Sequence, residues 1–245
     1  MFSPEDRDRL RRRLLDRAGA DPRLTAAAVT GSRAEGREDR WSDIDLFFGV
    51  RGPVEAALEE WTAFAYGDLA ALHHFELRSG PATYRAFLLD DGLQVDLGFT
   101  PAASFGPAGD GAFHAVFGTA GPRQPRPADV GFLVGMGWHH VLHVRSAIER
   151  GRPWRAEHWL SALRDVVLSL ASIRLGLPHS YARSADDLPE EVTMALRRTL
   201  VADLEPATLT TALAAGTTAL LVELRHVDNR LADRLAPVLG AAGAR

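Results

Sequence analysis

The stretch from Val29 to Phe48, VTGSRAEGREDRWSDIDLFF, decides the fold. It predicts an apolar strand, a turn at Gly31-Ser32, a polar loop and a second strand. Side chains on a strand alternate between its two faces, so Asp43 and Asp45 should share one face. The residues between and after them should point into the core: Ile44, Leu46 and Phe48.

This pairing of acids and turn has a chemical reading. Two carboxylates on one strand face, roughly 6.5–7 Å apart along the strand, can share divalent ions. The Gly31-Ser32 turn offers backbone N–H groups and a hydroxyl to a phosphate. Each feature alone is also typical of an ordinary turn or a solvated strand end. Together they predict a site for a metal-bound nucleoside triphosphate.

A third carboxylate stands in a similar setting. Residues 84–89 predict a strand, Asp91-Gly92 predicts a hairpin turn, and residues 93–99 predict the return strand. Alternation places Asp96 on the face opposite Leu93, Val95, Leu97 and Phe99. Asp96 is either a solvent-facing residue or the acid that completes the ligand set of a two-metal site.

Gly31-Ser32, ten intervening residues, Asp43-Ile44-Asp45 and the later Asp96 resemble the nucleotidyltransferase superfamily, which includes the DNA polymerase beta-like fold. The resemblance covers about residues 24–99. In size and layout, the chain is most similar to the bacterial antibiotic nucleotidyltransferases that modify aminoglycosides and lincosamides.

The resemblance implies roles for particular residues. Asp43 and Asp45 would hold Mg²⁺ against the triphosphate, and Asp96 would either complete a second metal site or accept the proton of the attacking hydroxyl. Two Mg²⁺ ions and ATP as co-substrate are expected. The residues expected to bind the nucleotide are Gly31, Ser32, Arg33, Arg164 and Arg174.

The wider pattern predicts an α+β protein with two domains. Residues 1–120 should form the mixed-sheet nucleotidyltransferase domain. Residues 101–127 are rich in Pro and Gly and predict a linker, with one short helix at residues 112–117. Residues 128–245 predict a bundle of four or five helices, including one at 189–203 and one at 206–235, which would form the other side of an acceptor cleft.

Composition excludes several classes of protein. The net charge of −4 argues against a general nucleic-acid binder, and the absence of cysteine excludes disulfides and thiolate zinc sites. No apolar run suggests a membrane span, so a cytoplasmic protein is expected. All 28 basic residues are Arg, and the run Arg11-Arg12-Arg13 is interpreted as a solvated helix face. The oligomeric state is left open.

Histidines form a second group of interest. His139 and His143 are four residues apart in a predicted helix and so share one face. They could ligate a metal, and the alternative is packing or substrate contact.

The sequence therefore predicts transfer of a nucleoside monophosphate, with AMP from ATP favoured, to a hydroxyl of a small molecule such as an antibiotic, with release of pyrophosphate. Two alternatives remain. The acceptor could be a protein or an RNA, as in toxin–antitoxin systems, or the chain could be a catalytically inactive nucleotide sensor. The sequence names neither the acceptor nor the preferred nucleotide.

Overall fold

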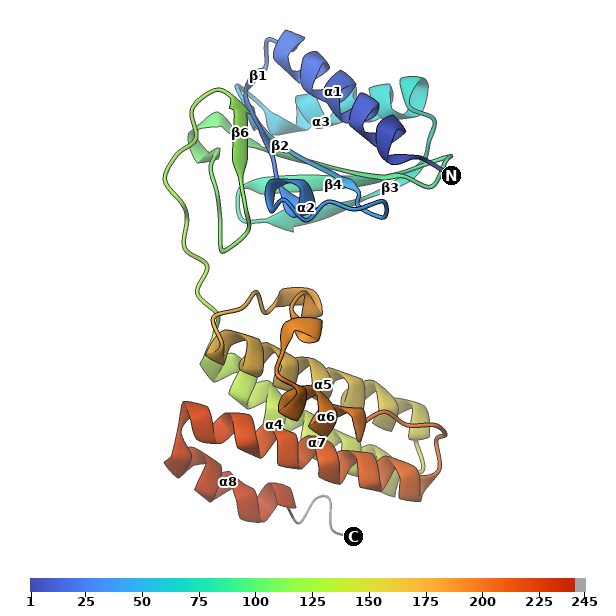
Figure 1. Cartoon of the computed structure of the whole chain (residues 1–245), viewed down its shortest axis with the longest axis vertical. Coiled ribbons are helices and arrows are strands. Elements are labelled where there is room, and N and C mark those ends of the chain that lie inside the picture. Colours follow the sequence, from blue (N-terminus) through green and yellow to red (C-terminus); the bar gives the residue numbers. More distant parts are fainter. Residues whose placement is uncertain (241–245) are drawn as a thin grey trace. The chain divides into compact units, whose positions relative to one another are not determined.

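The computed structural model describes residues 1–240, which fall into two compact units (Figure 1). The first unit is Met1–Pro127, and the second begins at Ala128. The first contains a mixed sheet with helices, whereas the second contains helices and no strand within its described residues. The predicted α+β class is therefore confirmed.

The sheet of the first unit has six strands in the order β3-β4-β5-β2-β1-β6. The β2–β5 pair is parallel and the other neighbours are antiparallel. The strands are β1 (Leu24–Val29), β2 (Ile44–Val50), β3 (Ala71–Ser79), β4 (Ala82–Leu89), β5 (Gln94–Pro101) and β6 (His114–Phe117). The helices are α1 (Pro4–Ala20), α2 (Gly31–Ala34) and α3 (Val54–Asp68), with a 3-10 turn at Ala102–Ser104.

Helices α1 and α3 cover one face of this sheet (Figure 1). Trp61 of α3 is fully buried there, with ring centroids 5.0 Å from Phe48 and 6.0 Å from Phe99. As predicted, Ile44, Leu46 and Phe48 point into this core. We call this side of the sheet the helix face, and the opposite side the open face.

The open face is only partly covered. Phe47 stacks on Tyr84 and on Phe105, with ring centroids 5.6 and 5.8 Å apart. Gly98 lies against the rings of Phe47 and Tyr84. A Cβ at this position would be 2.5 Å from Phe47 and 2.7 Å from Tyr84. A side chain at this position would separate the stacked rings, so glycine is required.

Residues 112–117 form no helix, and the predicted linker is instead part of the first unit. Residues 114–117 are strand β6, which pairs with β1 through Ala28 and Ala115. Phe105 and Phe113 pack on the open face. The prediction was wrong because the partner strand lies far earlier in the chain, and strand pairing between distant segments leaves no local periodicity.

The second unit has five helices among its described residues: α4 (Val130–Glu149), α5 (Pro153–Arg174), α6 (Glu190–Arg197), α7 (Pro206–Val227) and α8 (Asn229–Gly240). Two 3-10 turns lie at Ser180–Ala182 and Ala185–Asp187. The helix predicted for 189–203 is shorter than expected. The one predicted for 206–235 is two helices, because Asp228 is extended and its carboxylate caps the second by accepting from Leu231 N.

Helix α7 is the one helix in the described chain that is long and apolar enough to cross a membrane. The sequence pattern predicts no membrane-spanning run, so this finding is additional to it. Half of its most apolar stretch is buried against the other helices, and Leu213, Leu220 and Leu224 are almost fully buried there. Core helices of soluble proteins pass the same test, so α7 is weak evidence for a membrane.

An ion pair between α5 and α7 of the second unit gives the first prediction. Arg174 donates to both carboxylate oxygens of Glu223, at 2.9 Å each, and the Glu223 side chain is 3% exposed. Arg174→Met leaves a buried carboxylate unpaired, so it should lower the free energy of unfolding by about 2–3 kcal/mol. Urea unfolding measures this. The Arg174→Met/Glu223→Met double variant should recover most of the loss, and a double variant as unstable as the single one would contradict the assignment.

Candidate functional site

Three carboxylates meet on the open face of the sheet. Asp45 of β2 lies directly opposite Asp96 of β5 in the parallel register, and Asp43 is two residues before Asp45. Each of the three offers a carboxylate oxygen within 4.8 Å of the others, and all three are half-buried. Figure 1 shows β2 inside the sheet, which holds this carboxylate group on a rigid support.

The turn after β1 lies against this group. Thr30 N donates to the Asp45 carbonyl oxygen at 3.1 Å. Gly31 has a φ of +62°, and a Cβ there would be 1.9 Å from Asp45 Oδ2. Glycine is therefore required twice over, for its backbone conformation and for the approach of the carboxylate.

A buried ion-pair network fixes the loop that carries Asp43. Arg7 of α1 donates to the Ser42 carbonyl oxygen at 3.0 Å and also to the Asp39 carbonyl oxygen. The Glu38 side chain is 7% exposed and pairs with three arginines: Arg7 at 3.2 Å, Arg33 at 3.1 Å, and Arg11.

No local sequence pattern indicated this network. Arg11 is 6% exposed, so its predicted place on a solvated helix face was wrong. Arg7 and Glu38 carry no local signal, because an arginine in a polar helix and an acid in a polar loop look solvated until the chain folds. The network ties α1 to the residue immediately before Asp43.

Electrostatic strain concentrates at Asp96. Burial and the negative charge of Asp43 raise the pKa of Asp96 to about 6, against the opposing effect of a hydrogen bond from Gln94. Gln94 Nε2 lies 2.9 and 3.1 Å from the two Asp96 oxygens. Among the described residues, no arginine forms an ion pair with Asp43 or Asp96. Closely spaced hard oxygen donors of this kind fit a magnesium or manganese ion.

The residues predicted to bind the nucleotide fall into two groups. In the first unit, Ser32 Oγ is buried and has no hydrogen-bond partner within the described chain. A buried hydroxyl without a partner is rare and suits a ligand oxygen. Arg33 is exposed and pairs with Glu38.

The other two arginines lie in the second unit. Arg164 donates to the Thr199 carbonyl oxygen at 2.7 Å, and Arg174 is held by Glu223. Both therefore have partners within the helical unit. Their role in nucleotide binding stays a prediction.

The histidines form a compact group on α4. His139 Nε2 and His143 Nε2 are 3.0 Å apart, and both His140 and His143 stack on Trp159 of α5. Burial and the neighbouring histidines lower the pKa of His140 to about 4. The predicted sharing of one helix face is confirmed, and a metal role stays open beside packing.

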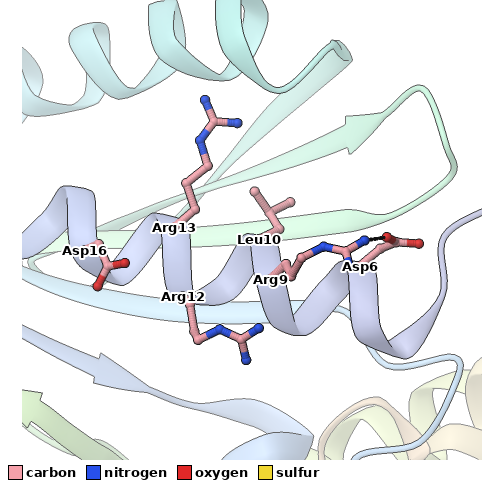
Figure 2. A pocket seen from close by; sticks show the side chains of 6 residues that line it. All are labelled: Asp6, Arg9, Leu10, Arg12, Arg13 and Asp16. Atoms are coloured by element: carbon pink, nitrogen blue, oxygen red, sulfur yellow. Dashed lines mark hydrogen bonds and ion pairs between the residues drawn. The ribbon is translucent and has the colours of Figure 1, made fainter.

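A surface hollow of about 630 Å³ lies along α1 and is separate from the carboxylates. Figure 2 shows Arg9 in contact with Asp6, while Arg12 and Arg13 extend in opposite directions. Helix α1 packs on the helix face, whereas the three carboxylates are on the open face. The hollow lies on the other side of the sheet from the carboxylates, so it is not part of the carboxylate site.

Comparisons with known proteins add little. No protein-family model matches the chain, and no curated protein sequence matches it. Among solved structures, the chain resembles an aminoglycoside 6-adenyltransferase from Bacillus subtilis, with 13% identity, a TM-score of 0.44 and all of both chains covered. A likeness this weak does not bear on function, so the site's own geometry must carry the functional interpretation.

The second prediction concerns the charge at Asp96. Its pKa in the folded chain, about 6, is above the value of 3.8 for an ordinary aspartate, so ionised Asp96 lowers stability above pH 6 and has no such effect below pH 3.8. Asp96→Asn should therefore raise the free energy of unfolding at pH 7.5 without metal, by about 1–2 kcal/mol after allowance for solvent screening.

Urea unfolding in EDTA at pH 7.5 and at pH 4 measures this effect. The gain should shrink at pH 4, where Asp96 is protonated in the folded chain. Asp110→Asn, at an exposed loop position, is the control and should show no gain. An equal gain for Asp96→Asn at both pH values would contradict the electrostatic origin.

The third prediction concerns the network behind Asp43. Arg7→Met removes the donor to Ser42 and Asp39, so the loop should lose its fixed position and Mg²⁺ affinity should fall about tenfold. Isothermal titration with Mg²⁺ measures the affinity. Arg9→Met changes an arginine of the same helix whose side chain is 67% exposed, and it should leave affinity unchanged. Equal affinities for the two variants would refute a positioning role.

Proposed function

We propose that the protein is a metal-dependent nucleotidyltransferase that joins a nucleoside monophosphate to a hydroxyl of a small molecule. The observation that carries this proposal is the convergence of carboxylate oxygens from Asp43, just before β2, Asp45 on β2 and Asp96 on β5, which lie within 4.8 Å of one another. Transfer of this kind needs charge neutralisation on both sides of one phosphorus atom, which converging carboxylates supply through bound cations.

The three carboxylates suit divalent cations. We favour Mg²⁺, and two ions. Asp43 and Asp45 would hold them, and Asp96 would contribute an oxygen or act as base. Bound ions of this class would neutralise the triphosphate and stabilise the leaving pyrophosphate. The chain's own contribution is rigidity, since Asp45 and Asp96 lie on paired strands and Asp43 follows a loop fixed by Arg7.

Asp96 is suited to accept a proton. A general base works best when its pKa is near the operating pH, and the pKa of Asp96, about 6, is closer to neutrality than that of an ordinary aspartate. In the proposed step, the acceptor oxygen forms a bond to the α-phosphorus and the bond to pyrophosphate breaks. The hydroxyl proton passes to Asp96.

Gly31 and Ser32 would face the leaving phosphates. The close approach of Gly31 to Asp45 shows that the turn lies beside the carboxylates. The unpartnered Ser32 Oγ is free to donate to a phosphate oxygen. ATP as the donor, AMP as the transferred group and an antibiotic as the acceptor follow from the sequence resemblance. Arg33, Arg164 and Arg174 remain proposed contacts of the triphosphate.

The fourth prediction tests this function. The protein is incubated with Mg²⁺-ATP and pooled hydroxyl acceptors, namely aminoglycosides, lincosamides and simple sugars, with pyrophosphate release and AMP adducts measured. Asp43→Asn and Asp45→Asn should lower pyrophosphate release by more than about a hundredfold, because each removes a cation ligand. Far-UV circular dichroism should show that both variants are folded.

Glu55→Gln, at an exposed position on α3, is the matched control and should keep full activity. Full activity in Asp43→Asn would refute the proposal. AMP found on a protein or an RNA, with no small-molecule adduct, would identify the alternative acceptor class. Binding of Mg²⁺-ATP without any pyrophosphate release would point to a nucleotide sensor.

A further inference from the structure

The strand order locates the acceptor, if the proposed function holds. The Gly31-Ser32 turn follows β1, and the sheet then continues through β2 with Asp45 and β5 with Asp96 to β4 and β3. Attacking and leaving oxygens stand on opposite sides of the transferred phosphorus in an in-line displacement. If pyrophosphate leaves toward the β1 turn, the attacking hydroxyl must approach from the β4 side.

The register shows what lies on that side. Asp45 pairs with Asp96, Asp96 with Ala86, and Ala86 with Phe75, so these four residues form one row across the open face. Adjacent strands are about 4.8 Å apart, which puts the Phe75 position about 10 Å from that of Asp96. This span matches a small molecule that has its hydroxyl at Asp96 and its body over β4 and β3.

The far end of this path carries exposed apolar side chains. Phe75 is 53% exposed, Leu77 55% and Leu88 47%. Ala86, between Asp96 and Phe75, is small and only 5% exposed, so the exposed apolar surface begins beyond it. Large apolar side chains that remain exposed beside a polar site are typical of a ligand surface. We call Phe75, Leu77 and Leu88 the apolar shelf.

Charge on the shelf side disfavours a polycation. The open-face residues of β3 and β4, in the described chain, include no carboxylate: His73, Phe75, Leu77, Ser79, Ala82, Tyr84, Ala86 and Leu88. Arg126 donates to Ser79 Oγ at 2.8 Å and so brings a positive charge to this end of the strands. A polyamine lying over β3 and β4 would meet Arg126 and no carboxylate on the open face of these two strands.

We propose that the acceptor of this enzyme is an uncharged hydroxyl compound with an apolar flank, bound with its hydroxyl at Asp96 and its flank on the apolar shelf. This inference deepens the proposed function and rests on it. It assigns acceptor recognition to Phe75, Leu77 and Leu88, and it separates this chain's acceptor from polycationic aminoglycosides.

The test uses two probes with the same sugar hydroxyls, methyl glucoside and octyl glucoside, the latter below its micelle concentration. Binding is measured by isothermal titration to the full chain with Mg²⁺ and a non-hydrolysable ATP analogue. Octyl glucoside should bind at least about tenfold more tightly, because its chain covers exposed apolar surface. Phe75→Ser should reduce that preference about tenfold, through loss of most of the apolar contact.

Val116→Ser is the matched control. Val116 is 49% exposed on β6, at the other edge of the same sheet, and its loss should leave the preference unchanged. Equal binding of the two glucosides overturns the inference, and this is also the result expected if another part of the chain covers the shelf. Tighter binding of kanamycin that is insensitive to Phe75→Ser overturns it as well.

Pyrophosphate release in the same samples distinguishes failure of the proposed function from failure of the acceptor assignment. Release that Asp43→Asn abolishes but Phe75→Ser leaves unchanged, at limiting octyl glucoside, keeps the proposed function and overturns the acceptor assignment. Failure of the wild-type chain to bind Mg²⁺-ATP overturns the proposed function, and the acceptor assignment falls with it.

Discussion

Parallel pairing of β2 with β5 is the constraint on which the site depends. It sets Asp45 opposite Asp96 and brings Asp43 within reach of both. Because side chains alternate along each strand, a shift of one residue in this register would turn Asp96 into the core and Val95 onto the open face. The buried row of β5 residues on the helix face resists such a shift, so core packing also fixes the carboxylates.

Repulsion between the closely spaced carboxylates lowers the stability of the folded chain. Like charges at short distance disfavour ionisation, which is why Asp43 contributes to the raised pKa of Asp96. A cation relieves this repulsion, so a metal would stabilise the folded chain as well as serve chemistry. Arg7 supports the arrangement from behind, through the Ser42 backbone rather than through a charge aimed at the site.

The two faces of the sheet have different roles. Aromatic and aliphatic side chains under α1 and α3 form the core that holds the strands together. The open face presents the carboxylates, and Phe105 covers only part of it. The exposed Phe75 and Leu77 on this face have no role in the core, which is the physical ground for assigning them to a ligand.

Sequence alone determined the α+β class, the strand that buries Ile44, and the common face of Asp43 and Asp45, because these follow from periodicities over a few residues. It also marked Asp96, whose chemical role, like those of the other site residues, stays a proposal. Tertiary structure decided what distant segments do to one another. Residues 114–117 form a strand that pairs with β1. Arg11 is buried, and it forms an ion pair with Glu38 of a distant loop. Such contacts join positions far apart in the chain, and no local pattern encodes them.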